Sequence, residues 1–100
     1  MNDIELVISE VLDHYPVKRA GLFGSAAKNE LKDESDIDIL VEFFPVPIGL
    51  LFFGLIEDLQ EALNRQVDIV DSRFLTRSKR HRFCEAIMQE VRYFYEREVI

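Results

Sequence analysis

The sequence has little cysteine and no long hydrophobic run. Cys84 is the only cysteine, which excludes an internal disulfide and any zinc cluster built from cysteines. The longest apolar stretch, residues 45–56, is interrupted by Pro47, Gly49 and Gly54 and is too short to span a bilayer. No basic region precedes an apolar segment at the amino terminus. We therefore expect no signal peptide, no membrane association and a cytoplasmic location.

An excess of positive charge is also missing. The 100 residues carry 12 lysine and arginine side chains against 19 acidic ones, a net charge of −7. Proteins that bind nucleic acid by displacing its counterions are usually basic, so we expect no strong nucleic-acid binding. One basic cluster, residues 77–82, contains four of the twelve lysines and arginines. It fits either a solvated helix start or a patch that faces an acidic partner or a triphosphate.

The remaining composition is that of an ordinary folded domain. Hydrophobic residues make up 48% and charged residues 31% of the chain, well away from disorder or a coiled coil. One hundred residues suit one domain with one core, and we find no repeat or linker. We expect residues 1–100 to form a single domain. Phe52, Phe53, Phe83 and Phe94 fit its core better than they fit a role in stacking on a base.

The hydrophobic pattern predicts helices and strands in alternation. Apolar spacing predicts helices over residues 3–14, from 48 to about 64, and over 76–89, and Ser25 caps a short helical turn up to about residue 30. Alternation and β-branched content predict strands over residues 17–23, 36–42, 66–70 and 91–95. The last segment also fits a continuing helix. This order predicts an α+β fold in which a mixed sheet of three to four strands packs with helices.

Two aspartates share one face of the predicted strand over residues 36–42. Asp36 and Asp38 are two positions apart, which puts their Cα atoms about 6.6 Å apart with both side chains on one side. Without a cation their repulsion is roughly 4 kcal/mol at about 4 Å and an effective dielectric near 20. Magnesium removes this cost and prefers oxygen ligands. The pair alone also fits the exposed face of an edge strand.

A third carboxylate lies in the predicted strand over residues 66–70. Asp68 stands between Val67 and Ile69, and carboxylates are seldom buried without a partner. If this strand lies beside the previous one, three carboxylates converge, as two-metal transfer at phosphorus requires. Asp68 then completes the second metal site and takes the proton of the acceptor hydroxyl. The alternative is an aspartate on an exposed strand end.

Gly24 and Ser25 follow a predicted strand and open a helical turn. Such a junction presents free backbone N–H groups, and glycine lets a phosphate approach the main chain closely. By itself the dipeptide is most often only a turn. Here ten residues separate it from the aspartate pair.

Together these residues resemble the signature of a known family. Gly24-Ser25 followed by residues 35–41, SDIDILV, is similar to the motif of the minimal nucleotidyltransferases, members of the DNA polymerase β-like superfamily. The resemblance implies the core fold of that superfamily. It also implies ATP as donor and two Mg²⁺ ions, and it assigns the β- and γ-phosphates to Gly24 and Ser25 and the metals to Asp36, Asp38 and Asp68.

One position departs from the family pattern. Many relatives carry Arg-Gly where this chain has Lys28 and Asn29. Lys28 keeps the positive charge expected near the phosphates but loses the two-pronged contact of arginine. Asn29 can still adopt a left-handed conformation. The departure therefore bears on nucleotide affinity rather than on the type of reaction.

The resemblance also implies a partner. Minimal nucleotidyltransferases are often paired with a small helical HEPN ribonuclease in two-component toxin–antitoxin systems, which makes this chain an antitoxin that adenylylates a tyrosine of the toxin. Two alternatives stay open: a catalytically inert module that masks its partner, and a small-molecule transferase of the antibiotic-modifying kind. A chain of this size has no room for an acceptor domain, so we expect the acceptor to come from a partner, in a homo- or hetero-oligomer.

Overall fold

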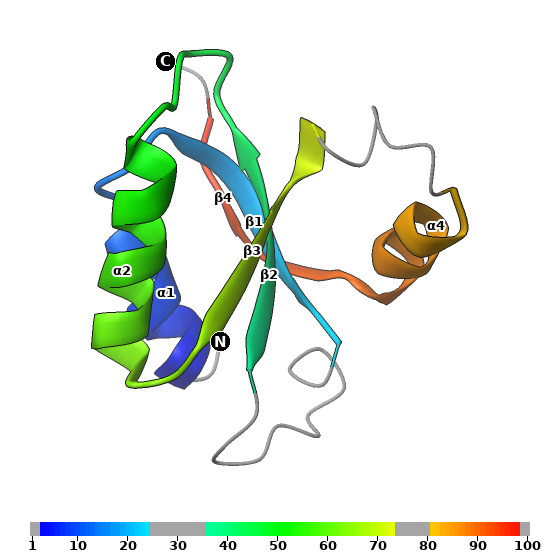
Figure 1. The fold of residues 1–100 in the computed structure, drawn as a ribbon, viewed down its shortest axis with the longest axis horizontal. Helices are drawn as coiled ribbons and strands as arrows, with labels where there is room; N and C mark the ends of the chain where they lie inside the picture. The colour runs from blue at the N-terminus through cyan, green and yellow to red at the C-terminus, as the bar shows by residue number, and fades with distance from the viewer. Residues whose placement is uncertain (1–2, 25–35, 74–80, 99–100) are drawn as a thin grey trace.

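A computed structural model describes residues 3–24, 36–73 and 81–98, the first four residues of the last range by their backbone alone. Helices and strands follow one another along the described chain, with two strands in succession after the first helix (Figure 1). Their bounds are α1 Asp3–Leu12, β1 Val17–Phe23, β2 Ile37–Phe43, α2 Leu51–Leu63, β3 Val67–Asp71, α4 His81–Glu90 and β4 Arg92–Glu96. The helical turn predicted to start at Ser25 lies outside the described residues. No helix among the described residues is long and apolar enough to cross a membrane.

The four described strands form one mixed sheet in the order β3-β2-β1-β4. β1 pairs antiparallel with both β2 and β4, whereas β2 and β3 are parallel. A parallel pair needs a crossover connection, which α2 supplies. The predicted α+β class with a mixed sheet is confirmed, and residues 92–96 are a strand rather than an extension of the preceding helix.

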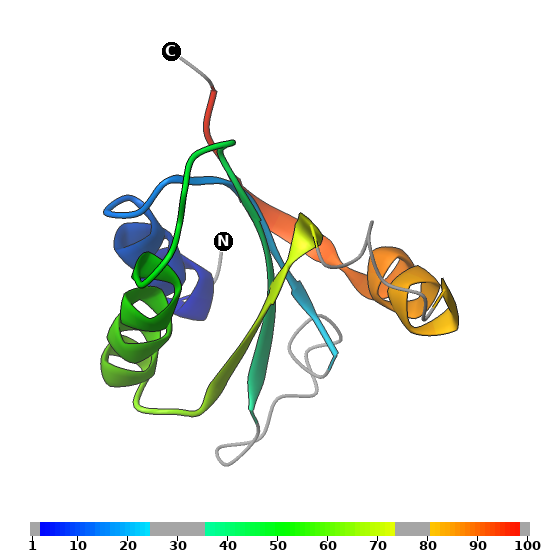
Figure 2. The ribbon, with the colours of Figure 1, turned by 45° about the horizontal axis from the view of Figure 1, so that its top comes forward.

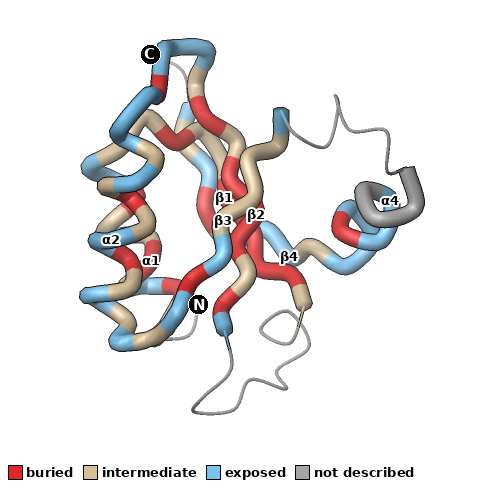
Figure 3. The backbone as a smooth tube through the Cα atoms, in the orientation of Figure 1, coloured by how far each residue is buried: buried red, intermediate tan, exposed pale blue. Residues whose placement is uncertain are grey.

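Two helices cover one face of this sheet. α1 and α2 lie side by side on the same face in both ribbon views (Figures 1 and 2). Alternate residues of β2 point toward them, because successive strand side chains leave opposite faces. The resulting main core contains the fully buried side chains Ile8, Leu12, Val17, Ala20, Ile37, Ile39, Val41, Leu55 and Leu59. Figure 3 shows buried stretches on both helices and on the strands that they cover.

The third described helix packs on the opposite face over a much smaller core. Ile87 of α4 contacts Phe23 and Leu40, with partly buried Val70 and Val91 around them. Gly21 permits the close approach of the α4–β4 junction. A Cβ atom at Gly21 would lie 2.6 Å from Cγ2 of Val91, so a larger residue would push the junction off the sheet.

The end of β4 is tied back to the turn between α1 and β1. The Arg97 guanidinium donates hydrogen bonds to the carbonyl oxygens of Val17, at 2.9 Å, and Tyr15, at 2.5 Å. The Tyr95 hydroxyl donates to the Asp13 carboxylate at 2.7 Å. Burial and this hydrogen bond raise the pKa of Tyr95 to about 12. These contacts fix β4 as a second neighbour of β1.

The bounds differ from the predicted ones in informative ways. β1 spans the predicted residues 17–23, while β2 and β3 each begin and end one residue later than predicted. α1 ends at Leu12 rather than at His14, because the next residues form tighter turn bonds, from His14 N–H to Val11 and from Tyr15 N–H to Leu12. Phe53 is 65% exposed, so its predicted place in the core is wrong.

Candidate active site

Two of the predicted site residues are direct neighbours in the sheet. The parallel register of β2 and β3 pairs Asp38 with Asp68. Adjacent strands lie about 4.7–4.9 Å apart, and paired side chains leave the same face. Leu40 and Val70, two residues further along each strand, belong to the small core under α4. Asp38 and Asp68 therefore project from the face opposite α1 and α2, beside that core.

The third predicted carboxylate stands just before β2. Asp36 is exposed, Asp38 is partly buried, and Asp68 is exposed. Asp68 is thus exposed, and it also lies beside Asp38. Burial raises the pKa of Asp38, and the charges of Asp68 and Asp36 raise it further. The three aspartates therefore form one electrostatic unit with excess negative charge.

The donor set suits a hard divalent cation. Three carboxylates supply the oxygen ligands that Mg²⁺ prefers. Among the described residues, no group of three or more histidine, cysteine or acidic side chains is gathered closely enough to hold a metal ion as it stands. The parallel register of β2 and β3 places Asp38 beside Asp68. Their side chains have to rotate before the carboxylate oxygen atoms can bind one ion.

Gly24 lies against the central carboxylate. It follows Phe23, which pairs with Asp38 across the antiparallel register of β1 and β2. Its φ of +66° lies in the left-handed region that favours glycine. A Cβ atom at this position would come 2.5 Å from Oδ2 of Asp38. The missing side chain therefore makes room for the Asp38 carboxylate, a contact that the sequence did not reveal.

The structure brings together four of the six predicted site residues. Asp36, Asp38, Asp68 and Gly24 meet at one end of the sheet, where β1 ends and β2 begins. Ser25 and Lys28 lie outside the described residues, as do residues 77–80 of the basic cluster. The sequence reasoning also missed Ile87, which packs on Phe23 and Leu40 and so borders the site from α4.

Comparisons with known proteins agree with this architecture. The nucleotidyltransferase domain family matches residues 4–94. Protein adenylyltransferase MntA of Thermococcus cleftensis is 32% identical over 97 residues, which cover 93% of this chain and 94% of the relative. A protein of Methanocaldococcus jannaschii, named as a candidate protein adenylyltransferase, is 46% identical over 61 residues, covering 61% of this chain and 71% of its own length.

Solved structures share the fold. A toxin–antitoxin structure with AMP-PNP aligns with a TM-score of 0.74 at 24% identity, covering 94% of this chain and 74% of the other. A structure of the tri-AMPylated HEPN toxin of Shewanella oneidensis in complex with MNT antitoxin aligns with a TM-score of 0.68 at 23% identity, covering 94% and 71%. With the match of the family over most of the chain, these findings show that this chain belongs to the nucleotidyltransferase domain family, among its minimal nucleotidyltransferases.

Proposed function

We propose that this chain is a magnesium-dependent adenylyltransferase that moves AMP from ATP to a tyrosine hydroxyl of a HEPN toxin and so acts as the antitoxin. The observation that carries the proposal is the pairing of Asp38 with Asp68 on adjacent strands, with Gly24 against Asp38. The names of its relatives, protein adenylyltransferases, support AMP as the group and a protein as the acceptor. The AMPylated HEPN toxin of a structural neighbour supports the kind of partner.

The three aspartates divide the work at the metals. Asp36 and Asp38 would hold two Mg²⁺ ions, and Asp68 would complete the second site. When bound, the ions stabilise the charge that develops on the phosphates. The acceptor oxygen forms a bond to the α-phosphorus while the bond from that phosphorus to the bridging oxygen of the β-phosphate breaks, releasing pyrophosphate. The acceptor proton passes to a carboxylate oxygen of Asp68.

The nucleotide is held by the segment that begins at Gly24. Backbone N–H groups at Gly24 and Ser25 bind the β- and γ-phosphates, and Lys28 neutralises part of their charge. Gly24 has two roles in this scheme. Its missing side chain lets a phosphate approach the main chain and leaves space for the Asp38 carboxylate, so phosphate and metal ligand meet at one residue.

The test is transfer of label from α-³²P-ATP to a purified HEPN protein, with antitoxin present at substoichiometric amounts. The parent should label many toxin molecules per antitoxin, whereas a variant with both Asp36→Asn and Asp38→Asn should label none. Asp3→Asn serves as the control, because Asp3 is an exposed aspartate of α1. If the double variant labelled the toxin as much as the parent does, Asp36 and Asp38 would not belong to the active site. If the toxin were inhibited only at an equimolar ratio and carried no label, the chain would be a module that masks its partner. If an aminoglycoside offered as the acceptor were labelled and the toxin were not, the chain would be a small-molecule transferase.

A further inference from the structure

The net charge of the chain lies in its helical layer. Residues 1–16 and 45–64, which contain α1 and α2, carry seven acidic side chains and no lysine or arginine. The rest of the chain carries twelve side chains of each sign. Glu5 is buried and forms an ion pair with Arg92, while the other six acids of this layer are exposed. A face of one sign repels itself and attracts partners of the opposite sign.

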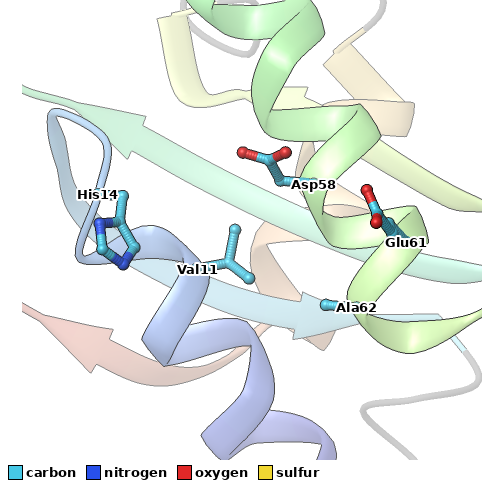
Figure 4. Close-up of a pocket in the computed structure, with 5 residues that line it drawn as sticks. All are labelled: Val11, His14, Asp58, Glu61 and Ala62. Carbon is cyan, nitrogen blue, oxygen red and sulfur yellow. The ribbon is translucent and has the colours of Figure 1, made fainter.

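A groove opens within this acidic layer. It is lined by Val11 and His14 from the end of α1 and the turn after it, and by Asp58, Glu61 and Ala62 from α2, and it encloses about 490 Å³ (Figure 4). Val11 and Ala62 are apolar, while Asp58 and Glu61 supply negative charge. Asp58 also accepts a hydrogen bond from the Tyr15 hydroxyl, which crosses from the α1–β1 turn to α2. The groove is therefore built by two helices that pack on each other.

Exposed apolar side chains lie at the start of α2, on the helix that lines one side of the groove. Residues four apart on a helix lie one above another, so the outer side of α2 and its N-cap forms two rows: Leu50, Gly54, Asp58 and Ala62, then Phe53, Glu57 and Glu61. Both rows begin with an apolar residue; the first then carries one acid, Asp58, and the second carries two, Glu57 and Glu61. Leu50 is 84% and Phe53 65% exposed. Large side chains this exposed, set beside a charged groove, are typical of a surface that another protein covers.

We propose that the outer face of α1 and α2 is a docking surface for a basic amphipathic helix of a partner protein. A groove between two helices accepts a third helix through apolar anchors spaced along one of its faces. Here the anchors would cover Leu50 and Phe53, and lysine or arginine side chains would face Asp58 and Glu61. The uniform negative charge of the layer sets the sign of the partner and speeds its encounter.

This docking surface is independent of the transfer chemistry. Asp38 and Asp68 project from the opposite face of the sheet, so a helix bound between α1 and α2 leaves them open. The inference goes beyond the proposed transfer, and its failure would leave the transfer standing. Conversely, an Asp38→Asn variant should bind the partner helix as well as the parent does.

The probe is a synthetic helix of about 14 residues, with leucine and lysine at helical spacing and a fluorescein label, and fluorescence anisotropy is the readout. A second peptide with glutamate in place of lysine is its control. The full-length chain should bind the lysine peptide and not the glutamate peptide. The double variant Asp58→Asn, Glu61→Gln should raise Kd by about tenfold or more, and Leu50→Ser with Phe53→Ser should raise it by a similar factor.

A matched variant separates local docking from overall charge. Glu85→Gln with Glu96→Gln removes two exposed negative charges from α4 and β4, away from the proposed face. This variant should keep the parental Kd, and circular dichroism should show all variants folded. The proposal would be overturned if the Glu85→Gln, Glu96→Gln variant bound the lysine peptide as weakly as the Asp58→Asn, Glu61→Gln variant does. Parental affinity of the Leu50→Ser, Phe53→Ser variant would overturn it too. Absence of binding to the lysine peptide would overturn it as well.

Discussion

The two faces of the sheet differ in how much they bury and in what they expose. The face under α1 and α2 holds the main core, in which Ile37, Ile39 and Val41 of β2 are fully buried. The other face holds a small core around Leu40 and, beside it, the carboxylate of Asp38. The same strand thus serves both faces through alternating residues. Asp38 belongs to the proposed active site and the next residue, Ile39, belongs to the main core, so substitutions at these two positions can test the two faces separately.

The largest expected effect is on the chemical face. Replacing Asp68 by asparagine removes the proposed acceptor of the hydroxyl proton and one metal ligand, so we expect the transfer rate to fall by about 10²–10⁴-fold. Asp68 is exposed, and the melting temperature should stay near the parental value. Single-turnover labelling of the toxin gives the rate, and differential scanning fluorimetry gives the stability. If the Asp68→Asn variant transferred AMP at the parental rate, Asp68 would have no role in the reaction.

The converse substitution lies one residue from Asp38. Ile39 is fully buried in the main core, so Ile39→Ala should lower the free energy of unfolding by about 2–5 kcal/mol through lost contacts and a residual cavity. Urea denaturation measures this change. The transfer rate per folded molecule should remain parental, measured well below the melting temperature. A loss of rate larger than the loss of folded protein would mean that the two faces are not separable.

A matched pair of glycines sharpens the comparison. Gly24 and Gly49 both have a positive φ, +66° and +51°, so alanine is strained at either position. A Cβ atom at Gly24 meets Oδ2 of Asp38 at 2.5 Å, whereas at Gly49 it meets nothing within 4 Å. Both variants should lose about 1–2 kcal/mol of stability from backbone strain. Only Gly24→Ala should weaken Mg²⁺ binding, by at least about tenfold, as measured by titration calorimetry with an ATP analogue. Equal Mg²⁺ affinity in the two variants would contradict a role of Gly24 in seating Asp38.

The smallest effect is a pH dependence of stability. Because the pKa of Asp38 is raised above its ordinary value of 3.8, the folded state holds the proton more tightly than the unfolded state. Stability is therefore lost as the pH rises from the ordinary value through the raised one. Asp38→Asn should melt above the parent at neutral pH without Mg²⁺, and the difference should vanish in acid. Thermal melts across this range check the sign, and a lower melting temperature of the variant at neutral pH would contradict it.

Some features followed from the sequence because they depend on local pattern. The alternation in residues 36–42 predicted which face of β2 each side chain takes, and residues 17–23 were predicted with their observed bounds. The family was predicted from Gly24, Ser25 and the aspartate pair, and the match over residues 4–94 confirms it. These features depend on periodicity and on a short motif, both of which a single sequence carries.

Other features depend on register, which a single sequence does not carry. The sequence placed Asp38 near Asp68 only if their two strands were neighbours. The structure shows that β2 and β3 are neighbours and that their parallel register pairs these two residues. The contact between Gly24 and Asp38 needs the antiparallel register of β1 and β2 as well. Phe53 was expected in the core on its residue type alone. Its neighbour Phe52 takes the inward position, and the helical period of 100° per residue turns Phe53 outward.

The tie between β4 and the α1–β1 turn has a consequence for synthesis on the ribosome. β1 obtains β4 as its second neighbour only when residues 92–97 emerge, roughly 4–15 s after β1 at about 5–20 residues per second. Until then β1 presents an unpaired edge of the kind that recruits strands of other chains. The Arg97 bonds to the carbonyls of Tyr15 and Val17 form in the same late step. Translation therefore delays closure of this sheet, and β1 has an unpaired edge during that interval.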